Sequence, residues 1–241
     1  SVFIKESPGI FETMIRFLTK GFIDFIVFSS VYSRGTKHTS ASFSFKAFLS
    51  FRKSFTMYPE YHSLFNISSV SLISLMSSEP IILAGNDQQK KEFLPLLTGS
   101  KAGAAAFALT EPEGGSDLNI ISTHATSDHN GYLLNGCKDY VINAGIARFI
   151  TVVAATNMRN KKASLRIFLI PDHVAGIKIE EIYHTSGINL APVGRVRFVD
   201  VNIIGQYVIK SRQAGSGYLL LTQTFDVGRA LVSALSVGIA R

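Results

Sequence analysis

The feature that most constrains the fold of this chain is a change in the spacing of its apolar residues near Lys101. Before this point, apolar positions such as Leu64, Ile67 and Leu75 recur every three to four residues, which is the period of a buried helix. After Gly103, the apolar residues gather in short runs separated by turn signals, which is typical of β-strands. We therefore expect a helical region followed by a β region.

The β region is expected to contain eight short strands. Their spacing favours an antiparallel β-barrel or sandwich. The pair Asn130-Gly131 predicts a hairpin turn, because both residues tolerate a positive φ. Neither a βαβ repeat nor a GxGxxG motif occurs in the sequence, so a Rossmann cofactor site is not indicated. The predicted strands are residues 104–109, 120–126, 132–134, 137–143, 149–156, 165–170, 177–182 and 195–201.

Helical patterns flank the β region on both sides. Asn86 is the predicted N-cap of a helix that continues to Leu97, and an apolar stripe predicts a further helix from Ser216 onward. The expected fold class is therefore α+β and multidomain. It comprises an N-terminal helical domain at residues 1–102, a middle antiparallel β-barrel or sandwich domain at 103–212, and the start of a C-terminal helical bundle at 213–241.

Composition and charge exclude several classes of protein. The net charge of +7 is spread evenly, without a block of basic residues, which argues against a nucleic-acid partner but suits a phosphate-bearing ligand. The single cysteine, Cys137, excludes an internal disulfide and indicates a reducing compartment. The six histidines are scattered, so no metal site is expected. The apolar run from Phe22 to Val31 is too short to span a membrane, and no clear targeting sequence is readable.

The most informative stretch for function is Phe107-Ala-Leu-Thr-Glu-Pro-Glu-Gly-Gly-Ser-Asp117. Gly114 and Gly115 allow successive backbone amides to point into one cradle, and Ser116 adds a hydroxyl donor where an anion would sit. No lysine accompanies them, so this is not a nucleotide-triphosphate loop. By spacing alone, a glycine-rich turn between two strands explains the stretch equally well.

This stretch is the first of several motifs that occur in a fixed order. The others are Asn135-Gly-Cys-Lys138 with Tyr140-Val-Ile-Asn143, Phe198-Val-Asp-Val201, Gly215-Ser-Gly-Tyr218 and Asp226-Val-Gly-Arg229. Taken together, the motifs resemble those of the flavin-dependent acyl-CoA dehydrogenases. The resemblance covers residues 107–241, whereas residues before about Ile82 match poorly.

The resemblance implies an enzyme that uses FAD to form a double bond between the α and β carbons of an acyl-CoA thioester. It further implies an electron-transfer flavoprotein as acceptor, and an intracellular location in a mitochondrial matrix or bacterial cytoplasm. By the same match, the FAD-binding residues are Phe107, Ala108, Leu109, Thr110, Gly115, Ser116, Tyr140, Val141 and Ile142. The expected CoA-binding residues are Ser116, Asp226 and Arg229.

Some positions depart from the family pattern. Ile142 stands where the family commonly has a hydroxyl near the flavin N5, and Asn189 stands where it usually has an arginine. In a minority of members the catalytic base precedes the last motif's arginine, but here that residue is Gly228. The usual base is a glutamate in the C-terminal bundle, and we interpret Glu111 and Glu113 as structural. We therefore expect no catalytic residue in residues 1–241, and a fragment that is inactive by itself.

Two other functions remain open at this stage. One is a non-catalytic chain that keeps part of the flavin and CoA surface and acts by binding. The other is an oxidase or monooxygenase on the same scaffold. The family is typically homotetrameric through its C-terminal bundle, which leaves assembly of these 241 residues doubtful.

Overall fold

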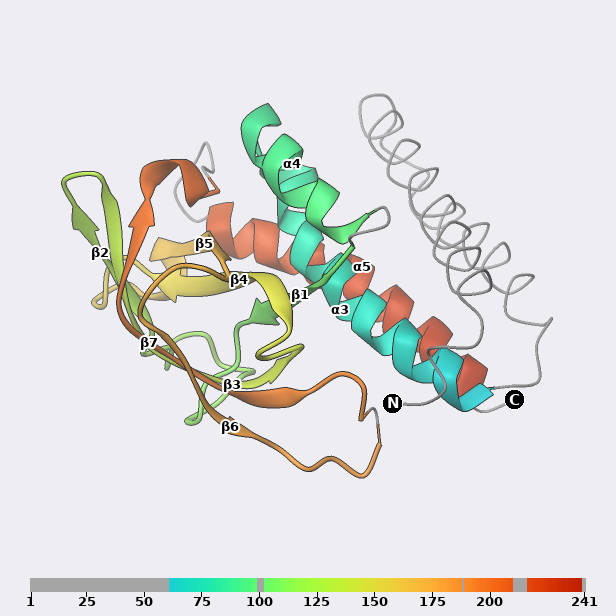
Figure 1. The fold of residues 1–241 in the computed structure, drawn as a ribbon. Coiled ribbons are helices and arrows are strands. Elements are labelled where there is room, and N and C mark those ends of the chain that lie inside the picture. Colours follow the sequence, from blue (N-terminus) through green and yellow to red (C-terminus); the bar gives the residue numbers. More distant parts are fainter. Residues whose placement is uncertain (1–60, 99–101, 188, 210–215, 240–241) are drawn as a thin grey trace.

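A seven-stranded sheet and the helices beside it form the part of the chain that the computed structural model describes (Figure 1), which is residues 61–98, 102–187, 189–209 and 216–239. The apolar run at 22–31 and the first 60 residues of the predicted N-terminal helical domain lie outside these ranges. The helices are α3 (Tyr61–Ala84), α4 (Asp87–Phe93) and α5 (Ser216–Ile239), with short 3-10 turns at η2 (Leu94–Leu97), η3 (Lys162–Ser164) and η4 (Gly205–Tyr207).

The predicted start of α4 is confirmed. The Asn86 side chain accepts a hydrogen bond from the Gln89 backbone N–H at 2.8 Å, and the Gln89 side chain accepts one from the Asn86 N–H at 3.0 Å. This reciprocal capping box satisfies two donors that a helix start otherwise leaves without partners. The predicted C-terminal helix from Ser216 is also confirmed, as α5.

The strands follow the predicted runs with two differences. Residues 132–134 and 137–143 form one long strand instead of two, and the run predicted from Ile120 becomes a strand only at His124. The strands are β1 (Ala104–Ala108), β2 (His124–Asp128), β3 (Gly131–Ile142), β4 (Ala147–Ala155), β5 (Leu165–Pro171), β6 (Ile177–Ile182) and β7 (Val193–Ile204). Their order is β1-β4-β2-β3-β7-β6, and β5 pairs with β4.

The expectation of an antiparallel sheet is wrong for part of this domain. β1 runs parallel to β4 along five residue pairs, and β2 makes a parallel contact with β4 where His124 faces Ala155. The chain leaves β1, passes through β2 and β3, and returns in the same direction as β4, which is the crossover that parallel strands require. β1 and β4 are buried along nearly their whole length, as parallel strands usually are.

The hairpin between β2 and β3 forms where it was predicted, but for a different reason. Asp128 pairs with Gly131 across a turn at His129-Asn130, and neither Asn130 nor Gly131 has a positive φ. A Cβ at Gly131 would instead lie 2.0 Å from the carbonyl oxygen of Ile203 on β7. The glycine is therefore needed for the close approach of two strands.

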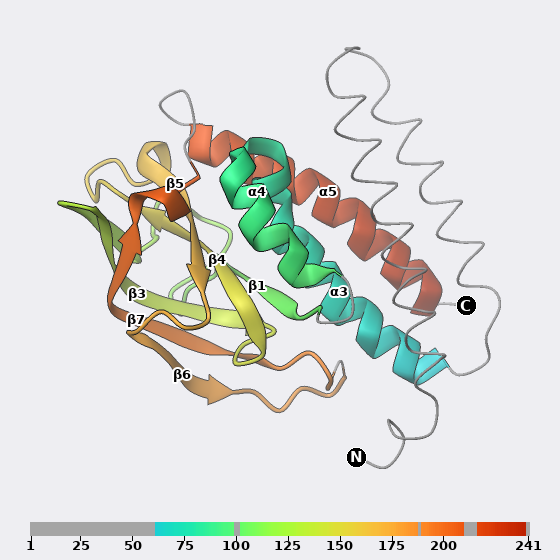
Figure 2. The same cartoon turned by 45° about the horizontal axis from the view of Figure 1, so that its top comes forward.

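The helices cover one side of the sheet (Figure 2) and are attached to it by polar contacts as well as apolar ones. The Ala105 N–H of β1 donates to the Ser74 hydroxyl at 2.9 Å, and the Thr151 hydroxyl of β4 donates to the Ser77 carbonyl at 2.8 Å. The apolar core beneath the helices contains Ile81, Phe93, Ala105, Phe149, Val153, Leu169 and Leu221. This packing holds β1 against α3, and Phe107 near the end of β1 contacts Phe225 of α5.

Candidate functional site

The loop that follows β1, residues 109–117, is fastened to β3 at its start. The Asp139 N–H donates to the Thr110 carbonyl at 2.8 Å, and the Lys138 Nζ donates to the Leu109 carbonyl at 2.8 Å. Glu111 and Gly114 then exchange two backbone hydrogen bonds of 3.0 Å, which close a tight turn. We refer to residues 109–117 as the signature loop. Its position is set by a strand that follows it in the sequence.

Beneath the signature loop lies a buried ion pair between Lys138 and Glu111. The two charged atoms are 2.8 Å apart, and the side chains are 0% and 3% exposed. The Glu111 carboxylate also accepts bonds from the Ser122 N–H and hydroxyl, both at 2.6 Å, and from the Thr123 N–H at 3.0 Å. Burial by itself would raise the pKa of Glu111, but Lys138 and these donors lower it to about 2. Glu111 is thus an ionised structural group and not a proton acceptor.

The outer side of the signature loop presents polar groups that are available to a ligand. Within the described residues, the hydroxyls of Thr110 and Ser116 take no hydrogen-bond partner, and Ser116 is exposed. Gly115 packs against Thr110, where a Cβ would stand 3.2 Å from its side chain. The loop therefore combines hydroxyl donors with a backbone that a ligand can approach closely, which suits a phosphate-bearing cofactor.

Tyr140 stands next to the signature loop in an unusual backbone conformation. Its φ is +51° and its residue surface is 65% exposed, although it follows the buried Asp139 directly. Its ring lies 5.4 Å from that of Tyr183, with 39° between the planes. A bulky side chain at positive φ costs free energy, and such residues cluster at functional sites. An exposed aromatic ring at this place provides a surface for a flat ligand to pack on.

The other predicted residues differ in what their side chains can touch. Ala108 and Val141 are 0% and 1% exposed, so only their backbones could meet a ligand. The ring of Phe107 makes an edge-to-face contact with Phe225 of α5, at 6.1 Å. Leu109 and Ile142 are half-buried. The Phe107–Phe225 contact places the middle of α5 beside the end of β1.

Asp226 and Arg229 follow that contact on α5. Both side chains are exposed and form an ion pair with each other, one helical turn apart. The structure therefore brings this predicted pair to the side of the molecule where β1 ends. Neither side chain is bonded to a residue of the signature loop in the described ranges.

Sequence reasoning missed a second polar cluster, which is centred on Asp139. One oxygen of this buried carboxylate accepts the Tyr183 hydroxyl at 2.5 Å and the Tyr140 N–H at 2.9 Å, and the other accepts Arg195 at 3.0 Å. Tyr183 and Arg195 are 44 and 56 residues away along the chain. No local pattern could have indicated this cluster, because its members meet only when β7 pairs with both β3 and β6.

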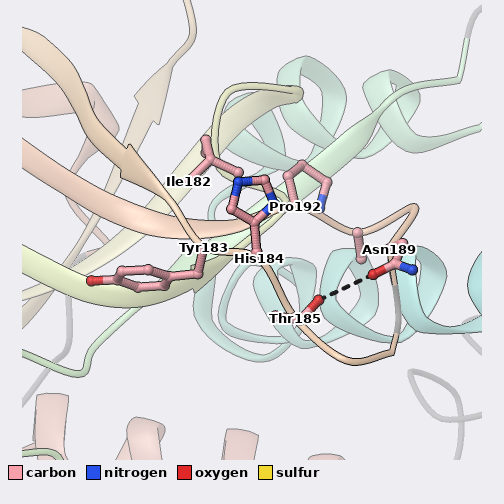
Figure 3. Close-up of a pocket in the computed structure, with 7 residues that line it drawn as sticks. Ile182, Tyr183, His184, Thr185, Asn189 and Pro192 are labelled. Atoms are coloured by element: carbon pink, nitrogen blue, oxygen red, sulfur yellow. Dashed lines mark hydrogen bonds between the residues drawn. The ribbon is translucent and has the colours of Figure 1, made fainter.

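A cavity of about 400 Å³ lies where the chain passes from β6 to β7 (Figure 3). Its lining residues are Ile182, Tyr183, His184, Thr185, Asn189, Ala191 and Pro192. Asn189, which departs from the family pattern, accepts a bond from the Thr185 hydroxyl at 3.4 Å across the turn. Figure 3 shows the Tyr183 ring directed away from these two side chains. Tyr183 therefore links the lining of this cavity to Asp139 and Tyr140 of β3.

The described ranges contain no group of three or more His, Cys, Asp or Glu side chains that could hold a metal ion. None of the helices placed by the structure is long and apolar enough to cross a membrane.

Comparison with known proteins agrees with the geometry. Residues 106–201 match the family described as acyl-CoA dehydrogenase, middle domain. The benzylmalonyl-CoA dehydrogenase of Aromatoleum aromaticum is 34% identical over 174 residues, which are 72% of this chain and 45% of that protein. The structure of butyryl-CoA dehydrogenase from Megasphaera elsdenii has a TM-score of 0.67 and 30% identity, over 73% of this chain and 46% of that one.

A structure described as PigA with FAD and proline has a TM-score of 0.65 and 28% identity, over 72% of this chain and 45% of that one. The chain therefore spans about half the length of the relatives that it matches. The matched residues include the signature loop, β3 and most of β7. The chain belongs to the acyl-CoA dehydrogenase family, whose middle domain it carries at residues 106–201.

Proposed function

We propose that this chain binds FAD at the signature loop, as part of an enzyme that dehydrogenates acyl-CoA thioesters. The observation that carries the proposal is that the hydroxyls of Thr110 and Ser116 have no hydrogen-bond partner in the described structure, while the exposed Tyr140 directly follows Asp139, whose N–H bonds to the Thr110 carbonyl. Polar donors next to a flat apolar surface suit a cofactor with a ring system and a pyrophosphate. The similarity to a protein solved with FAD supports the assignment.

In this proposal the chain binds the cofactor and the substrate and orients them. Thr110 donates to the ring system of the cofactor, Ser116 donates to the pyrophosphate, and Tyr140 packs against the ring. Asp226 and Arg229 contact the CoA part of the substrate from α5. When bound, FAD would supply the hydride acceptor, and the protein would supply position and electrostatics. We propose an electron-transfer flavoprotein as the partner that receives the electrons.

In this proposal, none of the carboxylates described at the site serves as the proton acceptor that such chemistry requires. The carboxylates of Glu111, Asp139 and Asp226 are each paired with a cation, and Gly228 has no side chain that could accept a proton. Glu113 lies exposed at the tip of the turn in the signature loop. The pairing of the three carboxylates with cations also favours a second candidate function, a chain that binds flavin and CoA without catalysis.

Titration of the purified chain with FAD tests the binding site. Thr110→Val and Tyr140→Ala should each weaken binding by about tenfold, since each removes one contact of the proposed cofactor. Thr126→Val is the matched control, because Thr126 is exposed on β2 and has no place in the site. Absence of FAD binding by the unmodified chain would refute the proposal. Equal effects of all three substitutions would place the cofactor elsewhere.

A further inference from the structure

Three hydrogen-bond donors converge on the buried carboxylate of Asp139, and they come from three separate strands or loops. The Tyr140 N–H belongs to β3, Arg195 to β7, and Tyr183 to the segment that follows β6. Asp139 itself is 4% exposed. Although burial alone would raise the pKa of this carboxyl, the three donors hold it below its usual value, so it is ionised at neutral pH.

The geometry of these bonds fixes both the backbone and the ring of Tyr140. The same oxygen of Asp139 accepts the Tyr140 N–H, which holds the backbone at a φ of +51°, and the Tyr183 hydroxyl. The Tyr183 ring is held in turn against the Tyr140 ring, at 5.4 Å. Tyr140 would otherwise be free to turn about its side-chain bonds, because 65% of its surface is exposed.

We propose that Asp139 and Tyr183 are positioning residues, which hold the Tyr140 ring in the orientation in which it packs against the cofactor. This inference rests on the proposed function, since it assigns Tyr140 to the FAD site. Its physical basis is preorganisation. A ring that is already oriented loses little conformational entropy when a ligand packs on it, so binding is stronger. Arg195 contributes by compensating the charge of Asp139.

A second ion pair, which also involves an arginine of β7, provides the matched control. Glu180 of β6 pairs with Arg197 of β7, and both are more exposed than Asp139. This pair also joins a carboxylate to an arginine, but neither residue bonds to Tyr140 or Tyr183 in the described structure. Glu180→Gln therefore removes a comparable interaction at the surface without affecting the ring pair.

The first experiment needs no cofactor. In the 241-residue chain with isotope-labelled tyrosine and phenylalanine rings, NMR measures the contact between the ring at 140 and the ring at 183. Tyr183→Phe keeps the second ring but loses the hydroxyl bond to Asp139, so the contact should largely disappear. Glu180→Gln should leave it unchanged. A contact of unmodified intensity in Tyr183→Phe would overturn the proposal.

The second experiment measures FAD affinity in a double-mutant cycle. Tyr183→Phe should weaken binding by about tenfold, the value of one hydrogen bond to a charged group, while Glu180→Gln should not weaken it. Adding Tyr140→Ala should cost much less affinity in the Tyr183→Phe background than in the Glu180→Gln background. A merely structural role for Tyr183 would make the two costs equal, which would overturn the proposal.

The two experiments separate this proposal from the proposed function. If the unmodified chain does not bind FAD, the proposed function fails, and with it the assignment of the Tyr140 ring to a cofactor site. The ring contact measured by NMR then still decides whether Asp139 and Tyr183 position Tyr140. If FAD binds equally to the unmodified chain and to Tyr183→Phe, the proposed function stands and the positioning proposal is wrong.

Discussion

Glu111 and Glu79 are both buried carboxyl groups, but they have opposite surroundings. Glu111 is paired with Lys138 and accepts three further hydrogen bonds, which lower its pKa to about 2. Glu79 of α3 is 6% exposed and has no ion pair within the described ranges, so burial raises its pKa to about 7. The two groups should therefore change the stability of the protein with pH in opposite directions.

The first prediction concerns Glu111→Gln. Because the pKa of Glu111 is lower in the folded protein than in the unfolded chain, its contribution is present above pH 4.5 and is lost as the pH falls toward about 2. We expect Glu111→Gln to lower the free energy of unfolding near pH 7 by about 3 kcal/mol. Urea unfolding at several pH values measures this. The exposed Glu113→Gln, on the same loop, is the control and should change little.

The second prediction concerns Glu79→Gln, for which the sign is reversed. Burial raises the pKa of Glu79 from 4.5 in the unfolded chain to about 7 in the folded protein. The folded protein is therefore most stable, with respect to this group, below pH 4.5, and it loses stability as the pH rises to about 7. Glu79→Gln should raise the free energy of unfolding at pH 8 by about 2 kcal/mol and have much less effect at pH 4. Destabilisation at pH 8 would show that the carboxylate has a partner that stabilises its charge.

At the scale of elements, α5 lies against the sheet and against α3 at two glycines. These two positions differ in how well they would tolerate a side chain. A Cβ at Gly217 would lie 1.9 Å from the carbonyl oxygen of Leu165, which is the first residue of β5. A Cβ at Gly228 would lie 2.9 Å from the terminal methyl of Met76 on α3. The Leu165 carbonyl cannot move without shifting β5, whereas the flexible Met76 side chain can turn away from an added methyl group.

The third prediction compares alanine at these two positions. Gly217→Ala should lower the free energy of unfolding by about 3 kcal/mol, because helix and strand must separate. Gly228→Ala should lie within about 1 kcal/mol of the unmodified protein, since alanine favours the helix and offsets the movement of Met76. The midpoints of urea unfolding give both values. Equal destabilisation would mean that α5 does not dock on β5 as described.

Whole elements also bring the family motifs into contact with one another. Asn135 and Asp200, from two different motifs, exchange two hydrogen bonds across β3 and β7. Lys138 of one motif neutralises Glu111 of another. Several residues that carry the resemblance thus hold the strands and the signature loop in place, while Thr110, Ser116 and Tyr140 remain available to a ligand.

For the molecule as a whole, the paired carboxylates lead to a fourth prediction. The 241-residue chain loaded with FAD should keep its visible flavin absorbance when an acyl-CoA is added without oxygen, because Glu111, Asp139 and Asp226 are each paired with a cation and are poor acceptors for the α proton. Reduction of the flavin by dithionite is the control that the bound cofactor is competent. Bleaching by the acyl-CoA would show that these residues include a base.

The sequence by itself determined the order of helices and strands, the capped start of α4 and the family, because these depend on local spacing and on motifs that can be read along the chain. It missed the parallel pairing of β1 with β4, since apolar runs do not show the direction of a partner strand. Only the tertiary structure assembled the Asp139 cluster and showed that Glu111 is a buried counter-ion. Those contacts join residues that are far apart in sequence, and their chemistry depends on burial, which exists only in the folded chain.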